Sequence, residues 1–172
     1  MLESFKKHIL KHNLFDENEN ILLAVSGGID YMVMTDLFRK MGINIGLIHC
    51  NFELRGNESD ADEQFVREFA FTNEIPFIVK RFNTLSYAAE KKISTQMAAR
   101  DLRYAWFEEM VNEKDFRYFA TAHHLDDQIE TFFINLFRGT GVSGLRGIPG
   151  KSRNCIRPLL FASREMIEQY AE

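Results

Sequence analysis

The stretch Ala24-Val25-Ser26-Gly27-Gly28-Ile29-Asp30 decides the fold of this chain. It completes an apolar run, Ile21 to Val25, and precedes a helix-like segment, Met32 to Met41, so it predicts strand, glycine turn and helix start. Two adjacent glycines let the backbone turn sharply, and N–H groups at a helix N-terminus attract phosphate. The spacing matches neither the Walker motif nor G-x-G-x-x-G. A phosphate site is our first hypothesis, and an ordinary tight turn is its alternative.

Length and composition predict one globular domain. The chain has 172 residues, of which 45% are hydrophobic and 27% charged. No apolar run approaches the roughly 20 residues that span a bilayer, and the N-terminus lacks the apolar core of a signal peptide. We therefore expect a cytoplasmic protein without membrane insertion. Cys50 and Cys155 are isolated in the sequence, which argues against a disulfide framework or a Cys-based metal site.

Apolar runs alternate with helix-like segments along the whole chain. Strands are predicted at residues 21–25, 43–49, 76–79, 116–121 and 155–160, and helices at residues 3–12, 32–41, 60–72, 85–111 (one or two helices) and 126–137. This alternation predicts an α/β doubly wound fold: a mainly parallel five-stranded sheet with helices on both faces. Ligands of such sheets bind beyond the carboxyl ends of the strands. Ser26, His49 and His123 are therefore expected to converge on one crevice.

The C-terminal third is basic although the net charge of the chain is −4. No Asp or Glu occurs from residue 131 to residue 164. This segment contains Arg138, Arg146, Lys151, Arg153, Arg157 and Arg164. Such a segment predicts either a phosphate-binding face or a solvated loop. Five glycines and a proline at residues 139–150 predict either a flexible lid or an ordinary long connection.

Two acidic groups are expected near the glycine turn. Asp30 lies beside any bound phosphate, where Mg²⁺ is the natural bridge, although an ordinary helix-start Asp is the alternative. After the fourth strand, Asp127 and Glu130 are three residues apart and share a helix face. They could hold an amine, position Mg²⁺ or exchange protons, and His123 could titrate near neutral pH. A merely polar helix start is the alternative, and zinc is disfavoured because no third ligand follows at a recognisable spacing.

Arg100 and Arg103 are about one helical turn apart, so they could clamp phosphate together or pair with a carboxylate such as Glu108. Aromatic side chains elsewhere are expected in the core rather than in a base-stacking platform. These are Phe69, Phe71, Trp106, Phe107, Phe132, Phe133 and Phe137.

Taken together, these stretches resemble the N-type ATP pyrophosphatases, which share an adenine nucleotide alpha hydrolase-like fold, and among them the tRNA(Ile)-lysidine synthases. The most specific match runs from His123 to Thr131. Further segments that carry the resemblance are Ser26-Gly27-Gly28 with Asp30, Leu54-Arg55-Gly56, Ser59-Asp60-Ala61-Asp62, Ala99-Arg100 with Arg103-Tyr104, Arg138-Gly139-Thr140-Gly141, and Gly144-Leu145.

The resemblance implies a reaction on the first anticodon base of an isoleucine tRNA with a CAU anticodon. ATP first adenylates the cytidine and releases pyrophosphate, and the amine of L-lysine then displaces AMP to give lysidine. The implied ATP-binding residues are Ser26, Gly27, Gly28, Asp30, Arg100 and Arg103. The implied catalytic residues are Asp30, His123 and Asp127, with Mg²⁺ on Asp30 and lysine on Asp127 and Glu130. The implied tRNA contacts are Arg138, Arg146, Lys151 and Arg153.

The chain departs from the family pattern in two ways. Tyr31 stands where the family places Ser, so a ring replaces a small hydroxyl at a crowded helix N-terminus. The family also continues with more of the catalytic domain and with tRNA-binding domains, so we expect residues 1–172 to be one PP-loop ATP pyrophosphatase domain of a longer protein.

Alternatives to lysidine synthesis remain open from sequence. They are a tRNA-thiolating relative, an amidating relative such as an NAD or GMP synthetase, and a catalytically silent nucleotide- or tRNA-binding module. The oligomeric state also stays open, with a homodimer among the alternatives.

Overall fold

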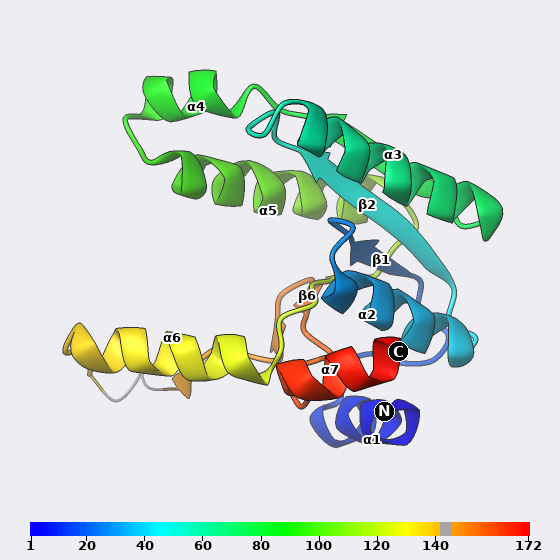
Figure 1. The fold of residues 1–172 in the computed structure, drawn as a ribbon. Coiled ribbons are helices and arrows are strands. Elements are labelled where there is room, and N and C mark those ends of the chain that lie inside the picture. Colours follow the sequence, from blue (N-terminus) through cyan, green and yellow to red (C-terminus); the bar gives the residue numbers. More distant parts are fainter. Residues whose placement is uncertain (142–145) are drawn as a thin grey trace.

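A computed structural model describes residues 1–141 and 146–172 of the protein. Its centre is a six-stranded sheet in the order β3-β2-β1-β4-β6-β5 (Figure 1). The strands are β1 (Ile21–Ala24), β2 (Ile45–Asn51), β3 (Phe77–Arg81), β4 (Tyr118–Ala120), β5 (Lys151–Ser152) and β6 (Cys155–Ile156). All neighbours pair in parallel except β5, which pairs antiparallel with β6. The predicted fold class is confirmed, and β5 adds one short edge strand to the five expected.

The helices follow the predicted alternation with a few differences. They are α1 (Leu2–His12), α2 (Ile29–Lys40), α3 (Asn57–Thr72), α4 (Thr84–Lys91), α5 (Thr95–Glu113), α6 (Leu125–Phe137) and α7 (Arg164–Ala171). The segment predicted at residues 85–111 forms two helices, because Asn83 caps α4 and Ser94 caps α5 through their side chains. Helix α7 was not predicted. The strand expected at residues 155–160 ends at Ile156, since Pro158 cannot donate a ladder hydrogen bond.

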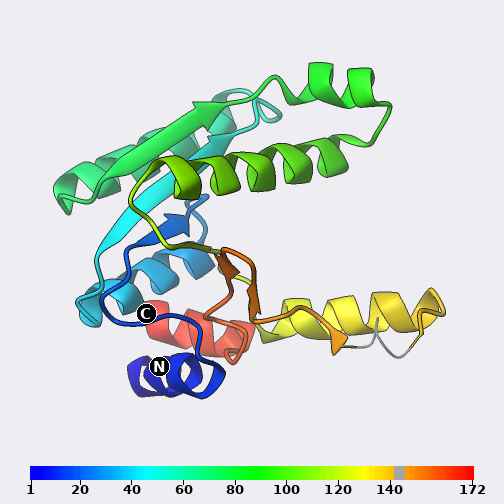
Figure 2. The same cartoon turned by 180° about the vertical axis from the view of Figure 1, so that it is seen from behind.

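Alternate side chains of β1 face opposite layers of the molecule. Ile21, Leu23 and Val25 belong to the larger core, to which α1, α2, α3 and α7 contribute buried residues. Leu22 and Ala24 instead belong to a second core with residues of α5. This two-sided burial explains why the strand reads as an unbroken apolar run. Figure 1 and Figure 2 show α4 and α5 on one side of the sheet and α1, α2 and α7 on the other.

Helix α6 projects from the body of the molecule in both views (Figure 1, Figure 2). No residue of α6, all of which the structure describes, is buried. Phe133 is 48% exposed and Phe137 is 85% exposed, and Phe71 on α3 is 87% exposed, so the prediction that these rings are core residues is wrong. Trp106 and Phe107 are buried as predicted. An apolar helix face is visible in a sequence, but the surface that covers it is not.

None of the helices in the described part of the chain is long and apolar enough to cross a membrane.

Candidate nucleotide-binding site

The glycine turn has the local structure that the sequence predicts. It connects the end of β1 to α2, and Gly28 is the N-cap residue of that helix. Gly27 has a φ of 85°, a left-handed conformation that favours glycine over any residue with a Cβ atom. The N–H groups of the first turn of α2 have no acceptor within the helix. They form a site for an anion at the N-terminal end of the helix dipole.

A pocket opens beside this turn at the carboxyl ends of β1 and β4. It encloses about 460 Å³ of empty space, part of which is open to solvent. Its lining residues are Ala24, Val25, Ser26, Tyr31, Cys50, Phe52, Arg103, Phe107, Thr121 and His123. Ser26 and His123, which are far apart in the sequence, therefore meet on one wall as predicted. Their convergence follows from the parallel pairing of β1 with β4.

His49 does not join this pocket, so that part of the prediction is wrong. It lies within β2 rather than beyond its end, and it is 3% exposed. Its Nδ1 lies 2.8 Å from the carbonyl oxygen of Val25, at the start of the glycine turn. Burial lowers the pKa of this imidazole. A neutral His49 thus supports the turn from the side of β2.

His123 is held as a neutral imidazole. Burial lowers its pKa to about 4, and the guanidinium groups of Arg157, Arg100 and Arg103 act in the same direction, against the carboxylate of Asp127. Its Nδ1 lies 2.8 Å from the hydroxyl oxygen of Thr121. The expectation that His123 titrates near neutral pH is therefore wrong. The sequence shows the histidine but not the arginines that face it.

The two predicted arginines occupy different positions on α5. Arg103 lines the pocket, and its guanidinium lies 5.2 Å from the ring centroid of Phe52. Arg100 is exposed and lies over the ring of Tyr104, at 5.0 Å from the centroid. Both charges lower the pKa of His123. Within the described residues, neither arginine forms an ion pair with Glu108.

The ring of Tyr31 points into the glycine turn. It lines the pocket, and its side chain interacts with that of Ser26. A Cβ atom placed on Gly28 would lie 3.8 Å from the Tyr31 ring, at ordinary van der Waals distance, so the ring lies next to the turn. Burial raises the pKa of the phenol, so it stays protonated at neutral pH. The ring thus occupies space beside the N–H groups that a phosphate would contact.

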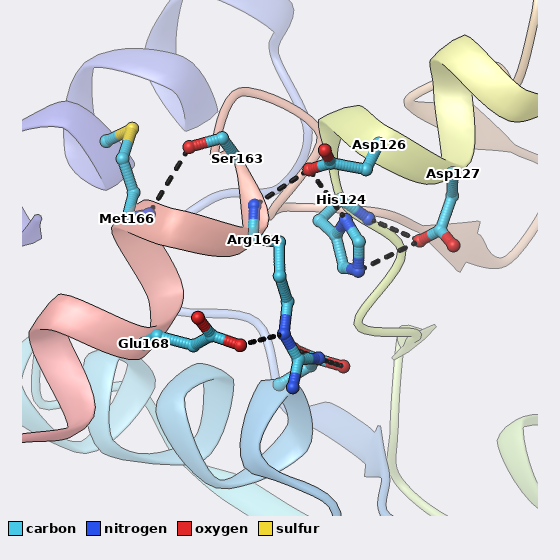
Figure 3. A network of polar contacts seen from close by, with 8 residues as sticks. His124, Asp126, Asp127, Ser163, Arg164, Met166 and Glu168 are labelled. Carbon is cyan, nitrogen blue, oxygen red and sulfur yellow. Dashed lines mark hydrogen bonds and ion pairs between the residues drawn. The ribbon is translucent and has the colours of Figure 1, made fainter.

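Asp30 lies at the start of α2 but faces α7 rather than the pocket. Its two carboxylate oxygens lie 2.8 and 3.1 Å from one terminal nitrogen of Arg164. Figure 3 shows Arg164 extending from the first turn of α7 toward α2. The predicted metal ligand therefore has a guanidinium partner that the sequence analysis did not anticipate.

The acidic start of α6 is partly structural. One carboxylate oxygen of Asp127 accepts a hydrogen bond of 2.8 Å from the backbone N–H of His124, which caps the helix. Asp126 accepts a hydrogen bond of 2.7 Å from the backbone N–H of Arg164 and so connects α6 to α7 (Figure 3). Glu130 is exposed one turn further along. Asp127 has a capping role in addition to any contact with a substrate.

The structure separates the four basic residues predicted to contact tRNA. Arg138 is the C-cap residue of α6, and exposed Arg146 lines a shallow hollow beside that helix. The Nζ of Lys151 lies 4.4 Å from the ring centroid of Tyr118, the first residue of β4. Arg153 is exposed in the turn between β5 and β6. Arg138 and Arg146 thus lie beside α6, Arg153 lies toward the amino-terminal end of β6, and the Lys151 ammonium reaches the start of β4.

The predicted lid is described only at its two ends, because residues 142–145 lie outside the described residues. On one side, Thr140 donates to the carbonyl oxygen of Asn135 at 3.0 Å. On the other, the Gln128 side chain accepts a hydrogen bond of 3.1 Å from the N–H of Ile148. Both flanks of the glycine-rich segment are therefore bonded to α6.

Arg157 and Arg164 are site residues that sequence reasoning missed. Arg157 directly follows β6, is 7% exposed, and donates to the carbonyl oxygen of Pro149 at 2.8 Å. Its Nε has no partner among the described residues. Arg164 begins a helix, where a cation is unfavourable. Recognition of Ser163 as the helix cap would have revealed this unusual position.

A strand, a glycine turn and a helix N-terminus beside a polar pocket define an α/β domain with a phosphate-binding turn. The chain belongs to the PP-loop domain family, whose model matches residues 1–172. It is 45% identical over 167 residues to a tRNA(Ile)-lysidine synthase of Parabacteroides distasonis. It is also 43% identical over 174 residues to the tRNA(Ile)-lysidine synthase of Chlorobaculum tepidum. The resemblance to this group is confirmed.

The chain spans only part of these relatives. The alignment with the first relative includes 97% of this chain but 38% of the relative. The alignment with the second includes 99% of this chain but 53% of the relative. A U34-tRNA thiolase, NcsA of Methanococcus maripaludis, shares the fold with a TM-score of 0.76 and 19% identity, over 99% of this chain and 63% of that one. An NH3-dependent NAD synthetase of Campylobacter jejuni shares the fold with a TM-score of 0.62 and 11% identity, over 99% of this chain and 68% of that one.

Proposed function

We propose that this chain performs the ATP-dependent ligation of L-lysine to C2 of the wobble cytidine of tRNA(Ile) with a CAU anticodon. The observation that carries the proposal is the convergence of Ser26, Arg103 and His123 on one pocket beside the glycine turn. Identities of 43–45% to tRNA(Ile)-lysidine synthases over nearly the whole chain support the choice of reaction. Cytoplasmic tRNA is the expected partner.

The first step forms a bond between the C2 oxygen of the cytidine and the α-phosphorus of ATP, and pyrophosphate leaves. The N–H groups around Ser26, Gly27 and Gly28 hold the departing anion, because the helix N-terminus carries a partial positive charge. Arg103 adds a fixed positive charge within the pocket, and Arg100 adds one at its margin. Preorganised charge of this kind stabilises a transition state without further rearrangement.

In the second step an amine of lysine attacks C2, and AMP leaves with the oxygen. Asp127 and Glu130 supply carboxylates for the lysine amines at the start of α6. His123 stays neutral at pH 7 and can accept a hydrogen bond or a proton from the attacking amine. The pocket thiol does not compete as a nucleophile, because burial raises the pKa of Cys50 to about 12.

Asp30 suits a cation that bridges protein and nucleotide. Mg²⁺ is commonly held by one or two carboxylates, phosphate oxygens and water. Among the described residues no group of three or more His, Cys, Asp or Glu side chains could hold a metal alone, so the donor set fits Mg²⁺ only together with ATP. When bound, Mg²⁺ would neutralise charge on the phosphates.

The test is an assay with ATP labelled at the α-phosphate, Mg²⁺, lysine and tRNA(Ile) bearing the CAU anticodon. We expect labelled AMP only when lysine and this tRNA are both present. AMP formation without lysine dependence would favour a thiolating or amidating relative. ADP as the sole product would contradict adenylation at the α-phosphate. A parallel assay of Tyr31→Ser separates a block by the ring from a lack of the activity.

A further inference from the structure

Arg164 holds both oxygens of the carboxylate that the proposed function assigns to Mg²⁺. The guanidinium nitrogen lies 2.8 and 3.1 Å from the oxygens of Asp30, whose side chain is 20% exposed. The two residues are 134 positions apart in the sequence, so the pair is a product of the fold. The guanidinium competes with any cation for these oxygens while it keeps its present position.

The placement of Arg164 at the first residue of α7 needs an explanation. A positive charge at a helix N-terminus is repelled by the partial positive charge of the helix dipole. Ser163 already caps this helix, and the backbone N–H of Arg164 is bonded to Asp126. The long side chain of Arg164 adds nothing to this capping. Its charge is compensated by Asp30 on α2 and by Glu168 on its own helix.

We propose that Arg164 is an exchangeable counterion of Asp30, which holds this carboxylate in the cation-free protein and releases it when a divalent cation arrives with the nucleotide. The inference rests on the proposed function, because that function supplies the reason for a cation at Asp30. Arg164 then sets the apparent affinity of the site for the cation. It is a positioning residue and has no contact with the reacting atoms in this account.

The surroundings of Arg164 allow this exchange without movement of α7. Its side chain is 45% exposed, and Glu168 accepts a hydrogen bond of 2.7 Å from its Nε, so a partner remains after Asp30 is released. Helix α7 is fixed independently by the Ser163 cap and by buried Ile167. Tyr170 also donates a hydrogen bond of 2.8 Å to Asp36 of α2. Only a side chain has to turn (Figure 3).

The experiment measures Mn²⁺ binding to the 172-residue chain by electron paramagnetic resonance, with and without α,β-methylene ATP. The test variant is Arg164→Gln. Arg117→Gln is the matched control, because it removes one positive charge from an exposed side chain at the start of β4, away from the site. Glu168→Gln removes the other ion-pair partner of Arg164 and leaves Asp30 in place. Thermal unfolding of each variant checks that it is folded.

We expect Arg164→Gln to bind Mn²⁺ about fivefold more tightly than the unaltered protein, the scale of one partly exposed ion pair. Asp30→Asn should abolish this gain when it is combined with Arg164→Gln. Arg117→Gln and Glu168→Gln should not produce such a gain. The proposal is overturned if Arg164→Gln leaves the Mn²⁺ affinity unchanged or weakens it. It is also overturned if Arg117→Gln gives an equal gain or if no Mn²⁺ binding depends on Asp30.

The two proposals fail in different ways. The Mn²⁺ titration with α,β-methylene ATP contains no lysine and no tRNA, so its outcome does not depend on the lysidine reaction. If Arg164→Gln shows the expected gain while the assay yields no AMP, the exchange stands and the proposed function fails. If AMP forms but Arg164→Gln leaves cation binding unchanged, the function stands and the exchange fails.

Discussion

Tyr31 places an aromatic ring against the turn that is expected to hold the phosphates of ATP. We expect Tyr31→Ser to bind ATP about tenfold more tightly and to form AMP on the order of 10²-fold faster, because the ring is removed and a small donor is restored. Isothermal titration with ATP and Mg²⁺ measures the first effect, and the α-labelled assay measures the second.

Tyr31→Phe is the matched control, because it removes the hydroxyl and keeps the ring. It should bind ATP no better than the unaltered chain. Equal improvement in Phe and Ser variants would show that the hydroxyl contact with Ser26, rather than the ring, limits binding.

His123 should make folding sensitive to acid. Its pKa is about 4 in the folded protein and ordinarily 6.5, so the unfolded chain binds more protons between these values. The stabilisation is therefore complete above pH 6.5 and is lost as the pH falls toward 4. Between pH 7 and pH 5 the unfolding free energy of the unaltered protein should fall by about 2 kcal/mol more than that of His123→Gln.

Urea titrations at several pH values provide the measurement. The half-buried His8, whose pKa is also lowered to about 4, is present in both proteins and cancels from the difference. Parallel curves for His123→Gln and the unaltered chain would contradict the low pKa.

At the scale of single residues, the sequence was enough to predict which polar groups lie at the site, but not their protonation states or their partners. Ser26 and His123 do meet, because each follows the end of a parallel strand, and Arg103 of α5 lines the same pocket. The pKa of His123 could not be predicted, since it depends on burial and on Arg157 across the fold. Asp30 was predicted to be a cation ligand, which stays a prediction, and its partner Arg164 lies at the start of a helix that was not predicted.

At the scale of secondary structure, β2 contains a glycine that its sequence does not explain. A Cβ atom on Gly46 would lie 2.6 Å from Phe116 Cζ and 3.3 Å from Leu22 Cδ1. Gly46→Ala should therefore lower the unfolding free energy by about 1–3 kcal/mol through overpacking. The midpoint of urea unfolding measures the loss, which should occur at an unchanged m-value.

Two further variants test this explanation. Gly141→Ala is the control, because a Cβ atom there meets none of the described residues within 4 Å. Phe116→Leu combined with Gly46→Ala should recover part of the lost stability, since the smaller side chain makes room for the methyl group. An undiminished loss in the double variant would show that Phe116 is not the obstacle.

Two elements, β5 and α7, were not predicted from the sequence, each for its own reason. Strand β5 has two residues, too few for a periodic pattern, and α7 follows a buried turn at residues 157–160 that reads as a strand. Helix α3 was predicted because its apolar residues repeat on one helix face, and β2 because a strand buried on both faces is a nearly continuous apolar run. Helix α6 was predicted correctly, but its exposure depends on what surrounds it.

For the whole molecule, alternation of strands and helices was enough to predict the doubly wound fold, because parallel crossovers leave few arrangements. The position of the basic residues in space was not predictable in this way. A run of positive charge in sequence suggested one face, yet the turn between β5 and β6 carries Arg153 to the amino-terminal edge of the sheet. Charge that is continuous in sequence is thus divided in the fold.

This division predicts unequal contributions to tRNA binding. Arg138 ends α6 and Arg146 lies along it, and this helix begins beside the site, whereas Arg153 and the Lys151 ammonium lie toward the starts of β6 and β4. Replacing Arg138 and Arg146 by Gln should weaken binding of a CAU anticodon stem-loop and lower its salt slope by about 1–2. The same change at Lys151 and Arg153 should have little effect.

Fluorescence anisotropy across a series of KCl concentrations measures both quantities. The two double variants have the same net charge, so general electrostatic attraction is equal and only position differs. Equal losses would mean that tRNA responds to the overall charge of the domain rather than to the α6 side. A larger loss for Lys151 and Arg153 would move the tRNA interface to the amino-terminal edge of the sheet and away from the glycine turn.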